Sequence, residues 1–482
     1  MAATAALVPV ALVATRPVRV RLIVAEAAPL GARLEVRTRL PATVEATVAG
    51  RHDDDLVFSS TASARRHTIQ LLGLYPDHLN EVIVTARTAD GRVHEVRQAI
   101  RTEALPGYYP TINVVRHNPD EIAPGFTFLN LGHYDDDGNH YALPSAIDSH
   151  GHVRWFYDGD VGHALHRLSN GNLLIAEEDD LVEIDMLGEP TGRRWSVPNG
   201  FHHDAIMLPD GNLLALSSAP DSFDDGLVEI DGSSGEIVRA WDSREILDPE
   251  RPRQPVNLEA IDWLHLNGVE YDHHHDAIIV SGRDQSAVVS TSRTTGKLRW
   301  ILGSHKHWSE EFQPFLLDPV GGDFEWQWGQ HAPMVHPRIP NRVLIYDNGN
   351  KRSYDAPLAA ADNYSRVVEY EIDQRTMEIR QLWEYGREYG SQLYTPFIGD
   401  ADYLPNGNRL VNFGGITRTL DGEPTELFDY EAGSVRPMKI SARIVEVSED
   451  TPAREILTIT IADPDATSYR GYRVYRAVRM GL

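Results

Sequence analysis

Hydrophobic and polar residues alternate along much of this chain with a period of two. Residues 18–24 read Val-Arg-Val-Arg-Leu-Ile-Val, and residues 34–37 and 81–84 repeat the alternation. A period of two places the apolar side chains on one face of a pleated strand. The Ala-Asp-Gly-Arg sequence at 89–92 indicates a tight turn between two such runs. We therefore expect residues 1–106 to form a small N-terminal β-sandwich, an accessory domain with oligomerisation or acceptor binding as alternative roles.

Beyond a turn-rich linker at residues 105–110, the chain repeats a pattern of four short strands. The tail of one copy lies at residues 146–155, and five further copies begin at His163, His203, His265, His331 and near Asp400. A four-stranded unit cannot bury both faces of its sheet alone, whereas radial stacking of several units can. The sequence therefore predicts an all-β chain with a six-bladed β-propeller over residues 107–482. Tryptophans that recur at the fourth strand are interpreted as packing between blades.

Histidines occupy equivalent places in this repeat. The first strand of each propeller blade lines the central channel, so its starting residue faces one mouth. Three first strands start with His203, His265 and His331, and a fourth starts with His163. Because 21 histidines among 482 residues is a modest number, their alignment is the informative observation. Arg283 follows the second strand of one blade and could reach the channel, although a surface arginine in a hairpin is the alternative.

The stretch Phe-Glu-Trp-Gln-Trp-Gly-Gln-His at 324–331 leads aromatic side chains into a single imidazole. We interpret His331 as a nucleophile at the channel mouth, with a purely structural histidine as the alternative. The aromatic residues, Trp328 among them, either stack on aryl groups of a substrate or simply pack the strand. A zinc or iron site is a further interpretation, but no tight spacing such as His-Glu-x-x-His supports it. Its ligands would be His202, His203, Asp204, His265 and His331.

Composition excludes several classes of function. Acidic residues outnumber basic residues by 71 to 45, which gives a net charge of -26. Nucleic acids and anionic membranes require a positive surface, so neither partner is expected. The absence of cysteine excludes disulfides, thiolate catalysis and cysteine-based zinc sites. We find no window of about 18 uncharged apolar residues and no convincing signal peptide in residues 1–16, so no membrane insertion is expected.

Four motifs carry a resemblance to a known family. They are Asp-Trp-Leu-His-Leu-Asn at 262–267, Ser-Gly-Arg-Asp-Gln-Ser at 281–286, Trp-Ile-Leu-Gly at 300–303 and Trp-Gly-Gln-His at 328–331. In this order they resemble the bacterial aryl-sulfate sulfotransferases, also called arylsulfotransferases, over residues 107 to about 415. The resemblance implies a six-bladed propeller that moves a sulfuryl group from a phenolic sulfate ester to an acceptor phenol. It also implies a ping-pong reaction without a nucleotide sulfate donor.

The resemblance assigns roles by motif position. It makes His331 the histidine that is sulfurylated transiently, with His265, Asn267 and Arg283 as donors of hydrogen bonds to the sulfuryl oxygens. A histidine of the pair at 202–203 would protonate the departing phenolate and later deprotonate the acceptor phenol. We choose His203 because it holds the same blade position as His331. Trp328 is a candidate for substrate binding, and neither a metal nor another cofactor is expected.

The expected partners are small aryl sulfates and phenols, and a homodimer is a possible assembly. Members of the family are typically periplasmic and some carry a disulfide, whereas this chain has no cysteine. Two alternative functions stay open. One is an aryl-sulfate hydrolase that passes the sulfuryl group from the same histidine to water. The other is a noncatalytic propeller that binds a ligand, for which four aligned channel residues would be unnecessary.

Overall fold

The computed structural model of the chain describes residues 17–52, 54–134, 140–159, 161–253, 262–426, 428–429, 434–435, 438–463 and 471–482. The expectation of no signal peptide in residues 1–16 lies outside these ranges. The described chain is nearly all-β, with one four-residue α-helix, α1 (Ser243–Ile246), and three short 3-10 helices. None of the helices in these ranges has the length and apolar character needed to cross a membrane. The chain divides into two compact units between Ala104 and Leu105.

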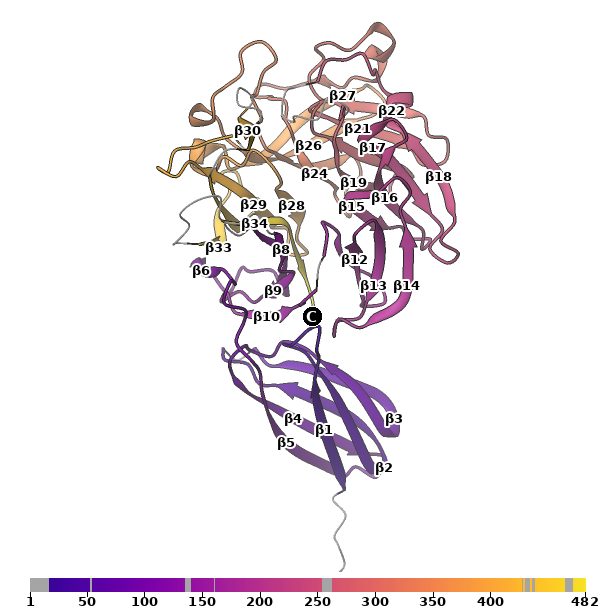
Figure 1. Ribbon diagram of the computed structural model, residues 1–482, viewed down its shortest axis with the longest axis vertical. Helices are drawn as coiled ribbons and strands as arrows, with labels where there is room; N and C mark the ends of the chain where they lie inside the picture. The colour runs from indigo at the N-terminus through magenta and orange to yellow at the C-terminus, as the bar shows by residue number, and fades with distance from the viewer. Residues whose placement is uncertain are drawn as a thin grey trace, which may run out of the picture. The chain divides into compact units, whose positions relative to one another are not determined.

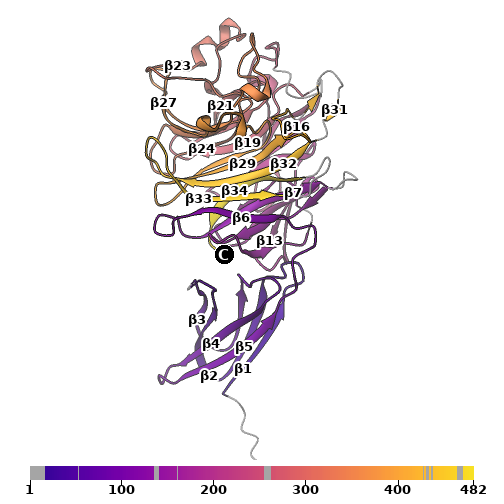
Figure 2. The same ribbon diagram turned by 90° about the vertical axis from the view of Figure 1, so that its left-hand side faces the viewer.

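The smaller unit is a single five-stranded antiparallel sheet (Figure 2). Its strands are β1 (Val18–Val24), β2 (Ala32–Val48), β3 (Leu56–Leu71), β4 (Leu79–Thr88) and β5 (Val93–Arg101). The long β2 pairs with β1 through its first half and with β4 through its second half, while β3 pairs along both. Alternate side chains of β2, such as Leu34, Val36, Val44 and Ala46, are buried. The expected alternation therefore builds the core of this unit.

The larger unit contains three consecutive four-stranded antiparallel sheets. The first has β11 (Leu165–Arg167), β12 (Leu173–Glu177), β13 (Asp180–Ile184) and β14 (Pro190–Ser196). The second has β15 (Phe201–Met207), β16 (Leu213–Ala219), β17 (Ser222–Ile230) and β18 (Ile237–Asp242). The third has β19 (Leu266–Asp272), β20 (Ala277–Gly282), β21 (Ala287–Ser292) and β22 (Leu298–Leu302). Each sheet keeps its strands in sequence order, as hairpin connections require.

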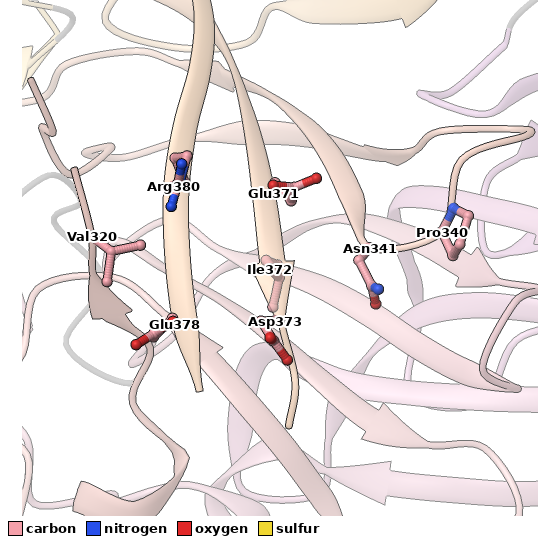
Figure 3. A pocket seen from close by; sticks show the side chains of 8 residues that line it. All are labelled: Val320, Pro340, Asn341, Glu371, Ile372, Asp373, Glu378 and Arg380. Atoms are coloured by element: carbon pink, nitrogen blue, oxygen red, sulfur yellow. The ribbon is translucent and has the colours of Figure 1, made fainter. Parts of the chain in front are cut away.

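A fourth sheet contains β24 (His331–Val335), β25 (Arg342–Asp347), β26 (Arg366–Asp373) and β27 (Glu378–Tyr385), with the short β23 (Asp318–Pro319) on its outer edge. A hollow at the outer strands of this sheet is lined by Glu371, Asp373, Glu378 and Arg380 among others (Figure 3). Carboxylates dominate this hollow, and none of the predicted site residues lines it. It therefore plays no part in the site described below.

Ten of the remaining strands form one sheet. One part has β28 (Asp400–Tyr403), β29 (Arg409–Arg418), β32 (Lys439–Val447), β33 (Glu455–Ala462) and β6 (Thr111–His117). The other has β34 (Gly471–Met480), β7 (Phe126–Tyr134), β8 (His140–Ala142), β9 (Ser145–Ile147) and β10 (Val153–Phe156). A separate two-stranded hairpin consists of β30 (Phe428–Asp429) and β31 (Ser434–Val435). β34 pairs antiparallel with β7, so segments from opposite ends of this unit share one sheet.

Inner strands of successive sheets contact one another in the pairs β15–β19, β19–β24 and β24–β28, and β28 contacts β34 within the ten-stranded sheet. Figure 1 shows these strands toward the middle of the larger unit, with β14, β18 and β22 farther out. Fourth-strand tryptophans join neighbouring sheets, since the indoles of Trp155, Trp195 and Trp383 donate to the carbonyls of Met186, Gly232 and Asp450. These bonds confirm that Trp155, Trp195 and Trp383 pack between sheets. The inner strands are thereby held side by side around the predicted site residues.

Candidate active site in the larger unit

His331 is the first residue of β24, and the chain before it is fixed to the end of β25. The backbone N–H of Trp328 donates to Asp347 Oδ1 at 2.9 Å, and its carbonyl accepts from Gly349 at 2.8 Å. Gly329 has φ of +60°, and a Cβ there would lie 2.0 Å from Asn350 Oδ1. Only glycine therefore allows this close approach. The result is a buried imidazole, with His331 4% exposed.

Gln330, the residue before His331, is held by hydrogen bonds of its own side chain and by Asn267. The Gln330 amide donates to Ser281 Oγ at 3.0 Å and to the Gly282 carbonyl at 3.1 Å. The Gln330 carbonyl accepts from Asn267 Nδ2 at 2.9 Å. Asn267 therefore uses one amide hydrogen to join β19 to the residue before β24. Its second amide hydrogen stays available for another acceptor. Its buried Oδ1 has no hydrogen-bond partner within the described chain.

Asn348 determines which nitrogen of His331 carries the proton. Asn348 Nδ2 donates to the carbonyls of Thr395 at 2.9 Å and Ile398 at 2.7 Å. Both amide hydrogens are thus used, so Asn348 Oδ1, 2.7 Å from His331 Nδ1, must accept a hydrogen bond from it. The tautomer assigned by this network has the proton on Nδ1 and a lone pair on Nε2. Nε2 is therefore the nitrogen available for nucleophilic attack.

Burial lowers the pKa of His331 well below 6.5, and the positive charge of Arg283 lowers it further. The hydrogen bond with Asn348 opposes these effects without cancelling them. A group that prefers the neutral form keeps its lone pair at neutral pH. His331 therefore has the protonation state that a nucleophile needs.

Arg283 is a buried cation that lacks a full set of acceptors. It is 5% exposed, its Nη2 lies 3.4 Å from the Pro396 carbonyl, and its Nε has no partner among the described residues. The nearest carboxyl, Asp284, is 4.0 Å from Nη1, and burial raises its pKa to about 7. A guanidinium with spare donors fits a tetrahedral anion. The surface-hairpin alternative for Arg283 is therefore wrong.

His265 forms a close pair with Asp262. His265 Nδ1 lies 2.6 Å from Asp262 Oδ2, and the backbone at His265 has φ of +54°. Burial alone would lower the pKa of His265, but the hydrogen bond and charge of Asp262 outweigh it and raise the pKa above 6.5. A carboxylate that accepts from Nδ1 orients the ring and stabilises its protonated form. His265 is thus the histidine of this group best suited to hold a positive charge.

His203 lies between His163 and His265. Its ring centroid is 5.4 Å from that of His163 and 4.8 Å from that of His265. Tyr475 of β34 stacks on His163 at 4.4 Å and donates its hydroxyl to the Asn267 carbonyl at 3.1 Å. Burial and the neighbouring histidines lower the pKa of His203 well below 6.5. The four aligned histidines thus include a contiguous cluster of three rings.

Asp204 does not belong to this cluster. Its carboxylate binds Arg476 at 2.6 Å, His166 at 3.2 Å and the backbone N–H of Val269 at 2.9 Å. The predicted metal site that includes Asp204 is therefore not formed. Asp224 of β17 lies near His202, His203 and His265 instead. The histidines at 273–275 lie in the β19–β20 turn, where His275 pairs with Asp272.

The aromatic lead-in packs against protein. Phe324 and Trp326 contact each other at 4.7 Å and join a buried cluster that includes Tyr370. Trp328 is 8% exposed, with its ring 5.5 Å from that of Tyr354. The structure thus favours strand packing for these residues. The role of Trp328 as a substrate contact stays a prediction.

A cavity of about 760 Å³ opens beside the histidine cluster. Tyr157, His163, Arg194 and Arg473 contribute to its lining. Small-molecule sites commonly occupy clefts of roughly 300–1,000 Å³. Of the four aligned histidines, His163 alone lines this cavity, and its ring stacks on that of His203.

Three functional candidates were missed from the sequence: Asn348, Asp224 and Tyr475. Asn348 lies in the sequence Asp-Asn-Gly at 347–349, which indicates only a turn. Asp224 belongs to none of the recognised motifs. Tyr475 comes from β34, more than two hundred positions after His163 and Asn267, which it contacts. Asp262 lies in the Asp-Trp-Leu-His-Leu-Asn motif at 262–267, so its position three residues before His265 could have identified it as the partner of that histidine.

Comparison with known proteins agrees with the motifs. A family model described as arylsulfotransferase (ASST) matches residues 111–470, and one described as arylsulfotransferase Ig-like domain matches residues 20–104. Arylsulfate sulfotransferase AssT of Escherichia coli O6:H1 is 26% identical over 529 aligned residues, covering 85% of this chain and 87% of the relative. The protein of the same name from Lelliottia amnigena is 25% identical over 564 aligned residues, covering 93% and 91%.

Solved structures give weaker similarities. Hydrazine synthase of Kuenenia stuttgartiensis has a TM-score of 0.34 and 12% identity, covering 64% of this chain and 68% of that one. A luciferin-regenerating enzyme has a TM-score of 0.35 and 10% identity, covering 77% and 100%.

Proposed function

Because this chain belongs to the arylsulfotransferase family, we propose that it moves a sulfuryl group from a phenolic sulfate ester to an acceptor phenol through a sulfohistidine at His331. No nucleotide sulfate donor takes part in this scheme. We also infer that the larger unit is a six-bladed β-propeller, with the ten-stranded sheet counting as two blades joined at β32 and β34. The observation that carries the function is a neutral, buried His331 beside the under-coordinated Arg283.

In the first half-reaction, His331 Nε2 attacks the sulfur of the donor. The nitrogen–sulfur bond forms, the bond from sulfur to the phenolic oxygen breaks, and the electron pair leaves with the phenolate. In-line transfer spreads negative charge over the three remaining sulfuryl oxygens, as in phosphoryl transfer. Arg283 and the free amide hydrogen of Asn267 are the proposed donors to these oxygens. Such preorganised donors contribute roughly 3 to 4 kcal/mol each in comparable sites.

Two histidines can divide the proton transfers. His265, whose protonated form Asp262 stabilises, is the better donor to the departing phenolate. His203, whose pKa is low, is the better acceptor of the proton from the incoming phenol. Passing this proton to the neighbouring His265, whose ring centroid lies 4.8 Å away, restores both histidines for the next turnover. In the second half-reaction the acceptor oxygen attacks the sulfur and restores neutral His331. The pairing refines the expectation that His203 alone serves both steps.

Intact-protein mass spectrometry after incubation with nitrophenyl sulfate tests the proposal. The wild type is expected to gain the mass of one sulfuryl group and to lose it when a phenol is added. His331→Asn should fold but gain nothing, because its amide nitrogen has no lone pair for attack. A mass gain in His331→Asn equal to that of the wild type would refute the assignment.

The two alternative functions give different outcomes in the same assay. A hydrolase would release sulfate at the same rate with and without an acceptor phenol. A noncatalytic binder would turn over no aryl sulfate, while His331→Asn would retain full ligand binding. The sulfotransferase requires that added phenol takes up the sulfuryl group in proportion to its concentration.

The compartment and assembly belong to the same proposal. We propose a periplasmic enzyme by analogy with the family, and a homodimer as its assembly. Cell fractionation and light scattering test these two points, and a cytoplasmic monomer would contradict both.

A further inference from the structure

The side chains of His202, His203, His265, Asp224 and Asp262 form a mixed cluster of imidazoles and carboxylates. In the sets His202–His203–Asp224 and Asp224–Asp262–His265, one ligand atom from each residue lies within 4.8 Å of the others. Asp224 belongs to both sets and comes from β17, whereas the histidine pair comes from β15. Imidazole and carboxylate are the donors that zinc takes in proteins lacking cysteine ligands.

The spacing of these donors is wider than that of direct hydrogen bonds. Asp224 Oδ1 lies 3.7 Å from His202 Nε2, and Asp224 Oδ2 lies 3.9 Å from His203 Nδ1 and 3.4 Å from His265 Nδ1. Charge-assisted hydrogen bonds are usually about 2.7 to 2.9 Å. Donors about 2.0 to 2.2 Å from a tetrahedral zinc ion stand roughly 3.4 Å apart. The distances therefore suit atoms arranged around a small cation.

A second observation also points to a ligand. His202 Nε2 is buried, and the described chain supplies it with no hydrogen-bond partner. Leaving a buried polar atom unsatisfied costs roughly 1 to 3 kcal/mol, so such an atom marks a place where a partner can be gained. The atom faces the Asp224 carboxylate, which is itself 7% exposed.

Asp262 and His265 support the cluster from one side. Because Asp262 Oδ2 binds His265 Nδ1 at 2.6 Å, that nitrogen is engaged by a carboxylate. The three remaining donor residues are His202, His203 and Asp224, and water can complete a tetrahedral set.

We propose that His202, His203 and Asp224 form a site for a divalent cation that prefers imidazole ligands, such as Zn²⁺, and that its binding blocks sulfuryl transfer. An ion on His203 holds the lone pair that would accept the phenol proton. The blocking effect rests on the proposed function, whereas the binding itself does not.

Titration of Zn²⁺ into the metal-free full chain, followed by calorimetry, tests the binding. The wild type is expected to bind one ion in this site, and Asp224→Asn to bind it about 100-fold more weakly, since an amide oxygen is a poorer ligand than a carboxylate. Both proteins carry His274→Ala and His275→Ala, which remove the half-buried histidines beside Asp272 as a competing site. Equal affinity in the two proteins would overturn the proposal.

His202→Gln serves as a second variant if Asp224→Asn does not fold, and the same loss of affinity is expected. For turnover, each protein is compared with its own metal-free rate. Zn²⁺ should inhibit the wild type, a chelator should restore its activity, and Asp224→Asn should need about 100-fold more Zn²⁺ for the same inhibition. Tight binding without inhibition would overturn the blocking effect alone. Sulfurylation of His331 is read separately by mass, so failure of the metal site leaves that result standing.

Discussion

At the scale of single residues, the chemistry proposed for His331 depends on an amide that contacts the opposite ring nitrogen, Nδ1. Asn348 accepts from Nδ1 because its own hydrogens are held by two backbone carbonyls. Rotating the amide would break both of these bonds, so the acceptor stays in place. The lone pair on Nε2 is a consequence of this arrangement and not of the imidazole alone.

We predict that Asn348→Ala lowers kcat about 10- to 100-fold, because the ring loses its orientation and its tautomer is no longer fixed. Nitrogen NMR of the His331 ring should show a mixture of tautomers in place of one. The matched control is Asn350→Ala, which removes a bond to the Pro396 carbonyl from the same loop without touching His331. If the control loses as much activity, loop stability and not the tautomer explains the effect.

A second residue-scale prediction concerns pH. The pKa of His331 lies well below 6.5, so the neutral nucleophile should persist as the pH falls through 6.5. The rate of single-turnover sulfurylation should therefore decline only at lower pH. Arg283→Met removes one cause of the lowered pKa, so it should move this decline to higher pH and reduce the rate about 100- to 1,000-fold. An unchanged pH profile would mean that Arg283 does not act on His331.

At the scale of elements, the turn before β24 is the sensitive point. Gly329→Ala would place a methyl group 2.0 Å from Asn350 Oδ1 at φ of +60°. We predict a loss of roughly 1 to 3 kcal/mol in unfolding free energy, with reduced kcat because β24 begins two residues later. Denaturant unfolding measures the first quantity.

Gly321→Ala is the control for this turn. Gly321 also has positive φ, +105°, but no atom lies within 4 Å of a Cβ there. It should therefore show backbone strain without the clash. Equal destabilisation in the two variants would remove the contact with Asn350 from the explanation.

The period of two and the turn residues predicted the strands well. Both signals are local, so β15 to β18 and β19 to β22 could be read from residues that are neighbours in sequence. The motifs also located Arg283 and His265. Asn348, Asp224 and Tyr475 could not be found in this way, because their roles depend on contacts between sheets. The choice between packing and substrate contact for Trp326 likewise needed its neighbours.

At the scale of the whole molecule, the larger unit depends on β34. This strand pairs with β7 and contributes Tyr475 and Arg476 to the interior. We predict that removing residues 471–482 abolishes activity and the cooperative thermal unfolding of the larger unit, because an inner row of hydrogen bonds is lost. The smaller unit has its own core, so its unfolding transition should persist.

Calorimetry of the truncated chain checks this prediction, with Tyr475→Phe as the gentler variant. Tyr475→Phe removes only the hydrogen bond to the Asn267 carbonyl and should lower stability by about 1 kcal/mol. A truncated protein that retains turnover would show that β34 is dispensable.

The position of β34 also has a consequence for biosynthesis. Tyr475 follows His331 and Arg283 in the chain, yet it packs against His163 and Asn267 near the middle of the unit. A ribosome that has already produced every proposed catalytic residue still holds an unfinished site. The nascent protein should therefore remain inert toward aryl sulfates until its closing strand has emerged from the exit tunnel, so catalytic competence arises only at the end of translation of this unit.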